Sequence, residues 1–408
     1  MTLILLFLFL MKKTRFFIVQ NLLFVFILVF VATGCGQSPA NPKGNLVNAA
    51  KKDSAGILNE PDYTFSPLPP PVADAYRLAV QDYYDKHLSH SGFNGAILVA
   101  KNGEIVFEDY RGYINFKTRE PITPNTPFHL ASISKTFTGM TILKLWEQGR
   151  LSLDDDLLKY FPKLPYHGVT IKMLLSHRSG LPNYLNFMDS FWNKKQKATN
   201  QDVVNYMAVH KPKIEYLPGK SYHYNNTNFM LLALVIEQVT HQLYPQYMKD
   251  SVFTPLGLKD TYVFTCKDTV NYIPTYVGNW PYPMDHLDCT YGDKNVYSTV
   301  RDLFVWDKAL YQHTFLKAST LDMAFTPQSN EHRSMHNYGL GWHLYFNNGD
   351  TVVYHNGKWH GENNNFTRLI DHTATIIILG NKQNGNIFAA KNMATIFSGK
   401  IDTTKFEE

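Results

Sequence analysis

The sequence has few cysteines and no cluster of charge of one sign. Its three cysteines, Cys35, Cys266 and Cys289, do not have the spacing of a zinc site. The net charge is +5, and the lysines and arginines are scattered among the acidic residues. This distribution does not predict a surface that binds nucleic acid. No internal repeat is recognisable either.

Apolar and aromatic residues are abundant. Hydrophobic residues make up 44% and aromatic residues 14% of the 408 residues. This composition is sufficient for a large core and argues against disorder over most of the chain. The length predicts about two domains or one large composite domain.

The N-terminus has the pattern of a targeting segment. The charged stretch Met11–Arg15 precedes an apolar run, Phe16–Val31, and then Ala32-Thr33-Gly34-Cys35. This pattern resembles a bacterial lipoprotein signal, in which Cys35 would carry the lipid, although Ala32 stands where Leu is usual. A membrane helix that is not cleaved and a plain secretory signal remain as alternatives. We therefore expect residues 1–35 to be a signal and the body to lie outside the cytoplasm, anchored at the membrane.

Two further expectations follow from this location. In an oxidising compartment Cys266 and Cys289 could form a disulfide, and two buried free thiols are an equal alternative. Residues 36–71 are rich in Asn, Pro, Gly, Lys and Ser and end in three prolines. This composition predicts a flexible tether between the membrane and the globular body, residues 72–402.

The order of the predicted helices and strands indicates a mixed fold. A helix is expected from about Val72 to His87, followed by a hairpin with Asn102-Gly103 between two apolar runs. Helical periods dominate residues 150–289, strand patterns return between Tyr338 and Gly380, and a last helix is expected to start at Asn386. The expected fold class is α+β: an antiparallel β-sheet flanked by the N- and C-terminal helices, plus an all-helical lobe.

These elements predict two lobes within the body. The α/β lobe would comprise about residues 72–131 and 290–402, and the helical lobe about residues 150–289. A cleft between two such lobes is a favoured place for a binding site.

Ser132 lies at the start of a predicted long helix, three residues before Lys135. Residues three apart share one face of a helix, so the two side chains can meet. Unpaired backbone N–H groups at a helix N-terminus stabilise an oxyanion, which makes Ser132 a candidate nucleophile. For an S-x-x-K pattern alone, a helix-capping serine beside a solvated lysine is the commoner alternative.

Two more motifs follow Ser132 along the chain. Tyr-x-Asn occurs five times, but only Tyr224-Asn225-Asn226 lies between a Pro-Gly turn and a long apolar helix. His355-Asn356-Gly357 lies on a later predicted strand as His-x-Gly and is followed by Lys358. Taken alone, these residues could be a core tyrosine, a helix cap and a histidine bonded to the backbone.

In this order, the three motifs resemble those of the serine β-lactamase and penicillin-binding protein superfamily, in its class C β-lactamase-related branch. His177–Pro182 resembles the His-Thr-Ser-Gly-Leu-Pro stretch of that family, and Ser298–Leu303 resembles its Ser-Thr-x-x-Asp-Leu helix start. The resemblance covers about residues 73–400 and implies a β-lactamase/transpeptidase-like fold. It departs from β-lactamases proper at His355, where they have the lysine of Lys-Thr-Gly.

The resemblance implies an extracytoplasmic serine hydrolase that acts through an acyl-enzyme on an ester, amide or D-amino-acid peptide. Ser132 would be the nucleophile, and Lys135 and Tyr224 would share the proton transfers. Asn226 would hydrogen-bond the substrate amide or the lysine. His355 would orient Tyr224 and the substrate.

The remaining residues of the third motif would hold the substrate. Gly357 would let the substrate backbone approach, and the backbone N–H groups of Ser132 and Lys358 would form the oxyanion hole. A neutral His355 binds a substrate carboxylate less strongly than a lysine does, which weakens the case for a DD-carboxypeptidase or β-lactamase. Lys358 could restore part of the positive charge that a lysine in place of His355 would provide.

The expected partners are a small-molecule or peptide substrate and the membrane, and the expected chemistry needs no metal or organic cofactor. Two alternatives stay open. One is a zinc hydrolase that uses His332 and His336, four residues apart as on a helix, with Glu331 beside them. The other is a catalytically inactive binding lipoprotein of the same fold. Neither the physiological substrate nor the oligomeric state has a signal in the sequence.

Overall fold

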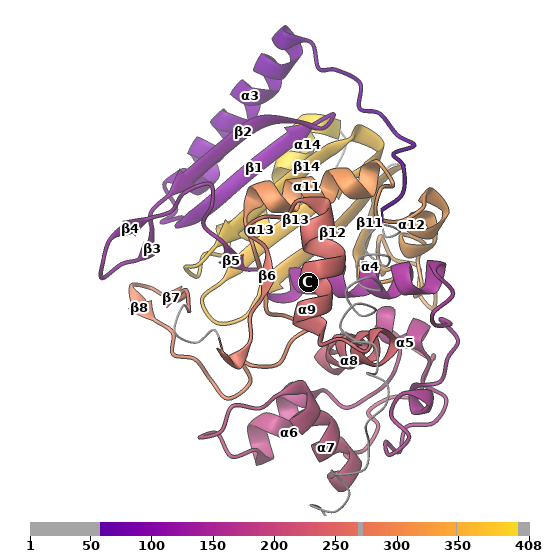
Figure 1. Ribbon diagram of the computed structural model, residues 1–408. Coiled ribbons are helices and arrows are strands. Elements are labelled where there is room, and N and C mark those ends of the chain that lie inside the picture. Colours follow the sequence, from indigo (N-terminus) through magenta and orange to yellow (C-terminus); the bar gives the residue numbers. More distant parts are fainter. Residues whose placement is uncertain (1–57, 268–271, 348, 399–408) are drawn as a thin grey trace, which may run out of the picture. The chain divides into compact units, whose positions relative to one another are not determined.

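The computed structural model describes residues 58–267, 272–347 and 349–398 (Figure 1). The predicted signal, with Cys35, and the first part of the predicted tether lie outside the described residues. Within the described residues, no helix is both long and apolar enough to cross a membrane.

A seven-stranded antiparallel sheet forms the centre of the fold, with the strand order β10-β11-β12-β13-β14-β1-β2 (Figure 1). The first two strands form the predicted hairpin, and Asn102 and Gly103 at its turn have φ values of 50° and 73°. Two positive φ values in sequence are what a type I′ turn requires. The strands of this sheet are β1 (Gly95–Lys101), β2 (Glu104–Arg111), β10 (His336–Tyr338), β11 (His343–Asn347), β12 (Asp350–Lys358), β13 (Asn363–Leu369) and β14 (Ala374–Gly380).

Helices cover both faces of this sheet, as Figure 1 shows. One face packs on the N-terminal helix α3 and the C-terminal helices through residues such as Ile97 and Val99, whereas Leu98 and Ile377 face the larger core under α11. Successive strand residues point to opposite faces, so apolar residues at successive positions supply two cores. The main helices are α3 (Pro70–Tyr84), α4 (Ser134–Glu147), α5 (Ile171–Leu175), α6 (Tyr184–Phe191), α7 (Asn200–His210), α8 (Asn226–Thr240), α9 (Tyr244–Met248), α10 (Thr254–Leu256), α11 (Val300–Tyr311), α12 (Ala318–Ala324), α13 (Asn386–Ala389) and α14 (Ala394–Ser398).

The predicted fold class is confirmed, with two local differences. The last helix is divided into α13, a 3₁₀ turn (Ala390–Met393) and α14. Asn384, rather than Asn386, supplies the side-chain oxygen at its start, which accepts a hydrogen bond from the backbone N–H of Asn386 at 3.0 Å. In residues 150–289 helices are the main regular elements, but loops and turns hold more of the described residues than helices do, so the expected all-helical lobe is not observed. The same residues contain the short strands β6 (Tyr262–Val263), β7 (Tyr276–Val277) and β8 (Trp280–Pro281).

The second half of the predicted tether is bound to the body. The backbone N–H of Leu68 donates to Glu104 at 3.1 Å, and the ring of Phe65 lies 5.8 Å from that of Tyr311. These aromatic contacts fix a segment whose proline content alone favoured a flexible linker. The predicted boundary at residue 71 is therefore too late, and α3 begins at Pro70.

Cys266 and Cys289 form a disulfide, with their Cα atoms 5.2 Å apart. This separation lies in the usual range for a disulfide. Of the two alternatives, the pair of free thiols is therefore wrong.

Candidate active site

Ser132 lies in a short 3₁₀ turn (Ala131–Ile133) directly before α4. The preceding residue, Ala131, has a φ of 48°, a left-handed conformation that costs energy for a residue with a side chain and that recurs at functional sites. The predicted helix thus begins two residues after Ser132. The N-cap of α4 is Ile133, so the alternative that Ser132 caps this helix is wrong.

Lys135 is fully buried and donates to three oxygen atoms. Its Nζ lies 3.0 Å from Ser132 Oγ, 2.8 Å from Asn226 Oδ1 and 2.8 Å from the backbone carbonyl oxygen of Asp293. Burial lowers the pKa of Lys135 to about 7, with the nearby Asp293 acting in the opposite direction and Lys294 adding to the decrease. The alternative of a solvated lysine is therefore wrong.

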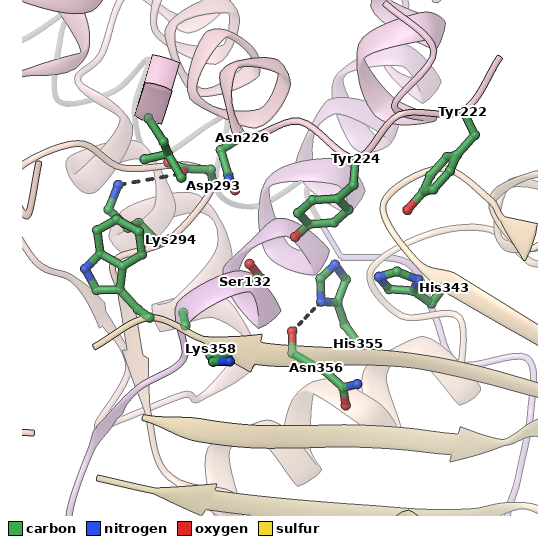
Figure 2. A pocket seen from close by; sticks show the side chains of 13 residues that line it. Ser132, Tyr222, Tyr224, Asn226, Asp293, Lys294, His343, His355, Asn356 and Lys358 are labelled. Atoms are coloured by element: carbon green, nitrogen blue, oxygen red, sulfur yellow. Dashed lines mark hydrogen bonds and ion pairs between the residues drawn. The ribbon is translucent and has the colours of Figure 1, made fainter. Parts of the chain in front are cut away.

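The second motif, Tyr224-Asn225-Asn226, lies at the start of α8 and reaches Lys135. Asn226 is the first residue of this helix, and the side chain of Asn225 caps it by accepting from the backbone N–H of Thr227 at 2.9 Å. Lys135 Nζ lies 4.9 Å from the centre of the Tyr224 ring. Figure 2 shows the hydroxyl groups of Tyr224 and Ser132 pointing toward each other. The structure thus brings together the predicted residues, and Asn226 binds the lysine.

His177 supports the segment that carries Tyr224. Its Nδ1 accepts from the backbone N–H of Asn225 at 3.1 Å, and its ring lies 4.3 Å from that of Tyr224. Burial, followed by the nearby Lys135, holds the pKa of His177 well below its usual range. A neutral ring can accept this bond, which fixes the backbone next to Tyr224.

The third motif lies on β12. His355 is buried, and its Nδ1 donates to the carbonyl oxygen of Asn356 at 2.7 Å while its Nε2 lies 3.3 Å from the Tyr338 hydroxyl. Burial is the main cause that holds the pKa of His355 well below its usual range, with His343 and Lys135 contributing. His355 is therefore a neutral residue of the cleft wall, and its ring lies 6.3 Å from that of Tyr224.

Gly357 has a different role from the one expected. A Cβ atom at this position would lie 2.2 Å from the carbonyl oxygen of Leu130, two residues before Ser132. The absence of a side chain therefore lets β12 approach the protein's own backbone beside the nucleophile turn. Gly357 does not line the cleft, so the expectation that it admits the substrate backbone is not supported.

One cleft of about 450 Å³ is lined by five of the predicted residues, Ser132, Tyr224, Asn226, His355 and Lys358. The buried Lys135 contacts this lining through its hydrogen bonds to Ser132 and Asn226. Ser132 lies in the middle of the cleft, with Tyr224 and His355 on one side and Asn226 on the other, and Lys358 lies on β12 below the serine (Figure 2). The apolar part of the wall is formed by Leu185, Tyr222 and Trp359. The cleft can hold a small substrate with its carbonyl group at Ser132.

Comparison with known proteins identifies the family. The protein family described as Beta-lactamase matches residues 80–398, which is most of the chain. The chain belongs to the β-lactamase family. The curated protein Penicillin-binding protein 4* of Bacillus subtilis is 33% identical over 309 residues, which cover 71% of this chain and 68% of that protein.

Two solved structures share the β-lactamase-family fold. D-amino acid amidase from Ochrobactrum anthropi SV3 aligns with a TM-score of 0.63 and 22% identity over 79% of this chain and 97% of the amidase. EstCE1, described as a hydrolase with promiscuous acyltransferase activity, aligns with a TM-score of 0.67 and 18% identity over 80% and 99%. At these identities, the two structures show that the chain shares their fold.

Several residues of this β-lactamase-family site had not been predicted from the sequence, among them Tyr222, His343, Asp293 and Lys294. Asp293 and Lys294 line the cleft next to Ser132, with side chains only 2% and 4% exposed. The resemblance to a helix start concerned the neighbouring residues Ser298–Leu303. The available signal was the adjacent opposite charges of Asp293 and Lys294, because charged residues that are buried are usually paired.

The zinc alternative finds no support. In the part of the chain that the structure describes, Glu331–Met335 form no helix and His336 begins β10, so the helical spacing of the two histidines does not apply. Glu331 instead forms an ion pair with Arg178. The alternative of a helical zinc pair is therefore wrong.

Proposed function

We propose that the protein is a serine hydrolase that forms an acyl-enzyme at Ser132. The observation that carries this proposal is the 3.0 Å hydrogen bond between Lys135 Nζ and Ser132 Oγ, made by a fully buried lysine whose pKa is lowered to about 7. Such a lysine is partly neutral near pH 7 and can accept the proton of the serine hydroxyl. Ser132 Oγ then attacks the substrate carbonyl carbon, and the carbonyl electron pair moves to the oxygen.

The rest of the cleft completes this reaction. The proton passes from Lys135, directly or through the Tyr224 hydroxyl, to the leaving group when the carbonyl forms again. The two groups act as one coupled unit. The backbone N–H groups of Ser132 and Lys358 are proposed to bind the oxyanion. Water then attacks the acyl-enzyme, while Lys135 and Tyr224 take its proton and return it to Ser132 Oγ, and the acid is released.

The proposed substrates are esters, amides and D-amino-acid peptides with a small acyl group. The related amidase and EstCE1 support this range at the level of the fold. The neutral His355 supplies no fixed cation for a substrate carboxylate. This argues against DD-carboxypeptidase or β-lactamase action as the main activity. It predicts faster turnover of p-nitrophenyl esters and D-amino-acid amides than of a cephalosporin.

The proposed location is extracytoplasmic, with Cys35 as a lipid anchor. The N-terminal charged and apolar pattern supports this location, and so does the Cys266–Cys289 disulfide, because disulfides persist mainly in oxidising compartments.

A covalent probe tests the nucleophile. A fluorophosphonate should label the protein once, and peptide mapping should place the label on Ser132. The variant Ser132→Ala should lose the label, while Ser190→Ala, an exposed serine on α6, should keep it. Equal labelling of Ser132→Ala and the wild type would show that the nucleophile is a different residue, and no labelling of the folded wild type would favour the inactive binding protein.

A further inference from the structure

Asp293 and Lys294 form a buried ion pair in the wall of the cleft. Asp293 Oδ2 lies 3.6 Å from Lys294 Nζ and accepts from the Tyr184 hydroxyl at 2.9 Å. Lys294 Nζ donates to Tyr184 and Thr290 and lies 4.8 Å from the centre of the Trp359 ring. Burial of two charges is costly unless they are paired and hydrogen-bonded. The cost of burying this pair in the cleft of Ser132 indicates that the pair has a role there.

The backbone of this pair is fixed to the nucleophile turn. The Asp293 carbonyl oxygen accepts from Lys135 at 2.8 Å. Three residues later β9 (Val296–Ser298) begins, and it pairs with β5 (Phe128–His129), which leads into the Ser132 turn. The backbone N–H of Val296 also donates to Ser134 Oγ at 3.0 Å. The small sheet of β5 and β9 therefore joins the turn that carries Ser132 to the segment that carries the Asp293 carbonyl group.

The two side chains act on Lys135 in opposite directions. Asp293 favours the protonated amine and Lys294 the neutral amine. Among the other groups around the lysine, the ring of Tyr224 lies 4.9 Å from its Nζ, and His177 and His355 are held neutral by burial. Asp293 and Lys294 thus form a pair of opposite charges that acts on Lys135.

We propose that Asp293 and Lys294 are positioning residues for the general base: the Asp293 carbonyl aims the amine of Lys135 at Ser132, and the two opposed charges set its protonation. The inference rests on the proposed function of Ser132 and Lys135. It predicts that removing either charge shifts the pKa of Lys135, in opposite directions for the two residues. Removing both charges should leave this pKa close to that of the wild type.

The experiment measures the rate of fluorophosphonate labelling of Ser132 against pH. Lys294→Met should move the midpoint of the acidic limb to higher pH, and Asp293→Asn should move it to lower pH, each by on the order of one unit for a charge several ångströms away in protein. The double variant should return the midpoint to within a few tenths of a unit of the wild type. If Asp293 and Lys294 had only a structural role, both variants would be labelled more slowly, and their midpoints would not shift in opposite directions.

Lys144→Met is the matched control. Lys144 is also a buried lysine of α4, paired with Glu147 at 3.5 Å, but it lies nine residues beyond Lys135, about 13 Å along the helix. It should lower the stability without moving the midpoint. Where a single variant does not fold, the neutral double variant carries the test, and a midpoint displaced by a full unit overturns the proposal. Labelling at Ser132 with unmoved midpoints in all variants also overturns it while leaving the proposed function intact, whereas absence of Ser132 labelling in the wild type removes the proposed function itself.

Discussion

At the scale of single residues, Gly357 controls how closely β12 approaches the nucleophile. Replacement by Ala would place a Cβ atom 2.2 Å from the Leu130 carbonyl oxygen, a backbone atom that cannot turn away. We expect Gly357→Ala to lower the free energy of unfolding by about 1–3 kcal/mol. It should also slow Ser132 labelling by roughly 100-fold, since a displacement of about 1 Å at a reacting group has effects of this size.

Gly385→Ala is the control for this change. A Cβ atom at Gly385 would meet nothing within 4 Å, so both the stability and the labelling rate should stay close to those of the wild type. Unchanged labelling in Gly357→Ala would mean that β12 does not hold the Ser132 turn in place.

Single residues also show what sequence could and could not predict. Ser132, Lys135, Tyr224 and Asn226 were predicted because their motifs occur in a fixed order with recognisable flanks. The role predicted for Gly357 is not supported, because close approach to a substrate and close approach to the protein's own backbone require the same residue type. Asp293 was missed because its contact with Lys135 is made by a backbone carbonyl, which every residue type possesses.

At the scale of elements, the disulfide is the feature whose removal is simplest to measure. Cys266 and Cys289 are 23 residues apart and close a loop that contains β7 and β8. A disulfide that closes a loop of this size typically contributes about 3 kcal/mol. We expect the Cys266→Ser/Cys289→Ser variant to unfold at a lower temperature than the wild type. Dithiothreitol should lower the unfolding temperature of the wild type but not that of the variant.

Peptide mapping without reduction provides the direct check of this pairing. It should recover the peptides of Cys266 and Cys289 as one linked species. Recovery of both as separate thiol peptides from protein exported by its host would contradict the disulfide.

The predicted elements differ in how well sequence could place them. The β1–β2 hairpin was placed correctly because the Asn102-Gly103 turn has a local conformational requirement. The boundary between tether and body was not, because residues 58–69 owe their order to contacts with Glu104 and Tyr311 that lie far along the chain. Composition predicts a flexible segment correctly only when no residue far along the chain binds that segment.

At the scale of the whole molecule, the predicted architecture is correct because hydrophobic periodicity fixes which face of each element is buried. Residues 97–99 of β1 contribute to both cores in turn, and such alternation within a central strand requires helices on both faces. The pairing of β1 with β14, which joins the two ends of the body, has no local signal in the sequence and was not predicted.

The buried lysine also affects the stability of the whole molecule. Burial lowers the pKa of Lys135 to about 7 in the folded protein, against an ordinary value of 10.5 for a lysine side chain. Between these values the unfolded chain binds a proton that the folded protein does not, so the free energy of unfolding rises with pH in this window. The slope from this one group approaches about 1.4 kcal/mol per pH unit.

The variant Lys135→Met removes this titration. Urea unfolding of both proteins between pH 7 and 9, where few other groups titrate, should give a difference in stability, wild type minus variant, that increases with pH. The absolute difference also contains the hydrogen bonds lost at Asn226 and Asp293, whereas its pH dependence belongs to the lysine. A difference that stays constant across this range would mean that Lys135 remains protonated when folded. The hydroxyl of Ser132 would then have no neutral amine beside it, and the proposed general base would have to be a different group.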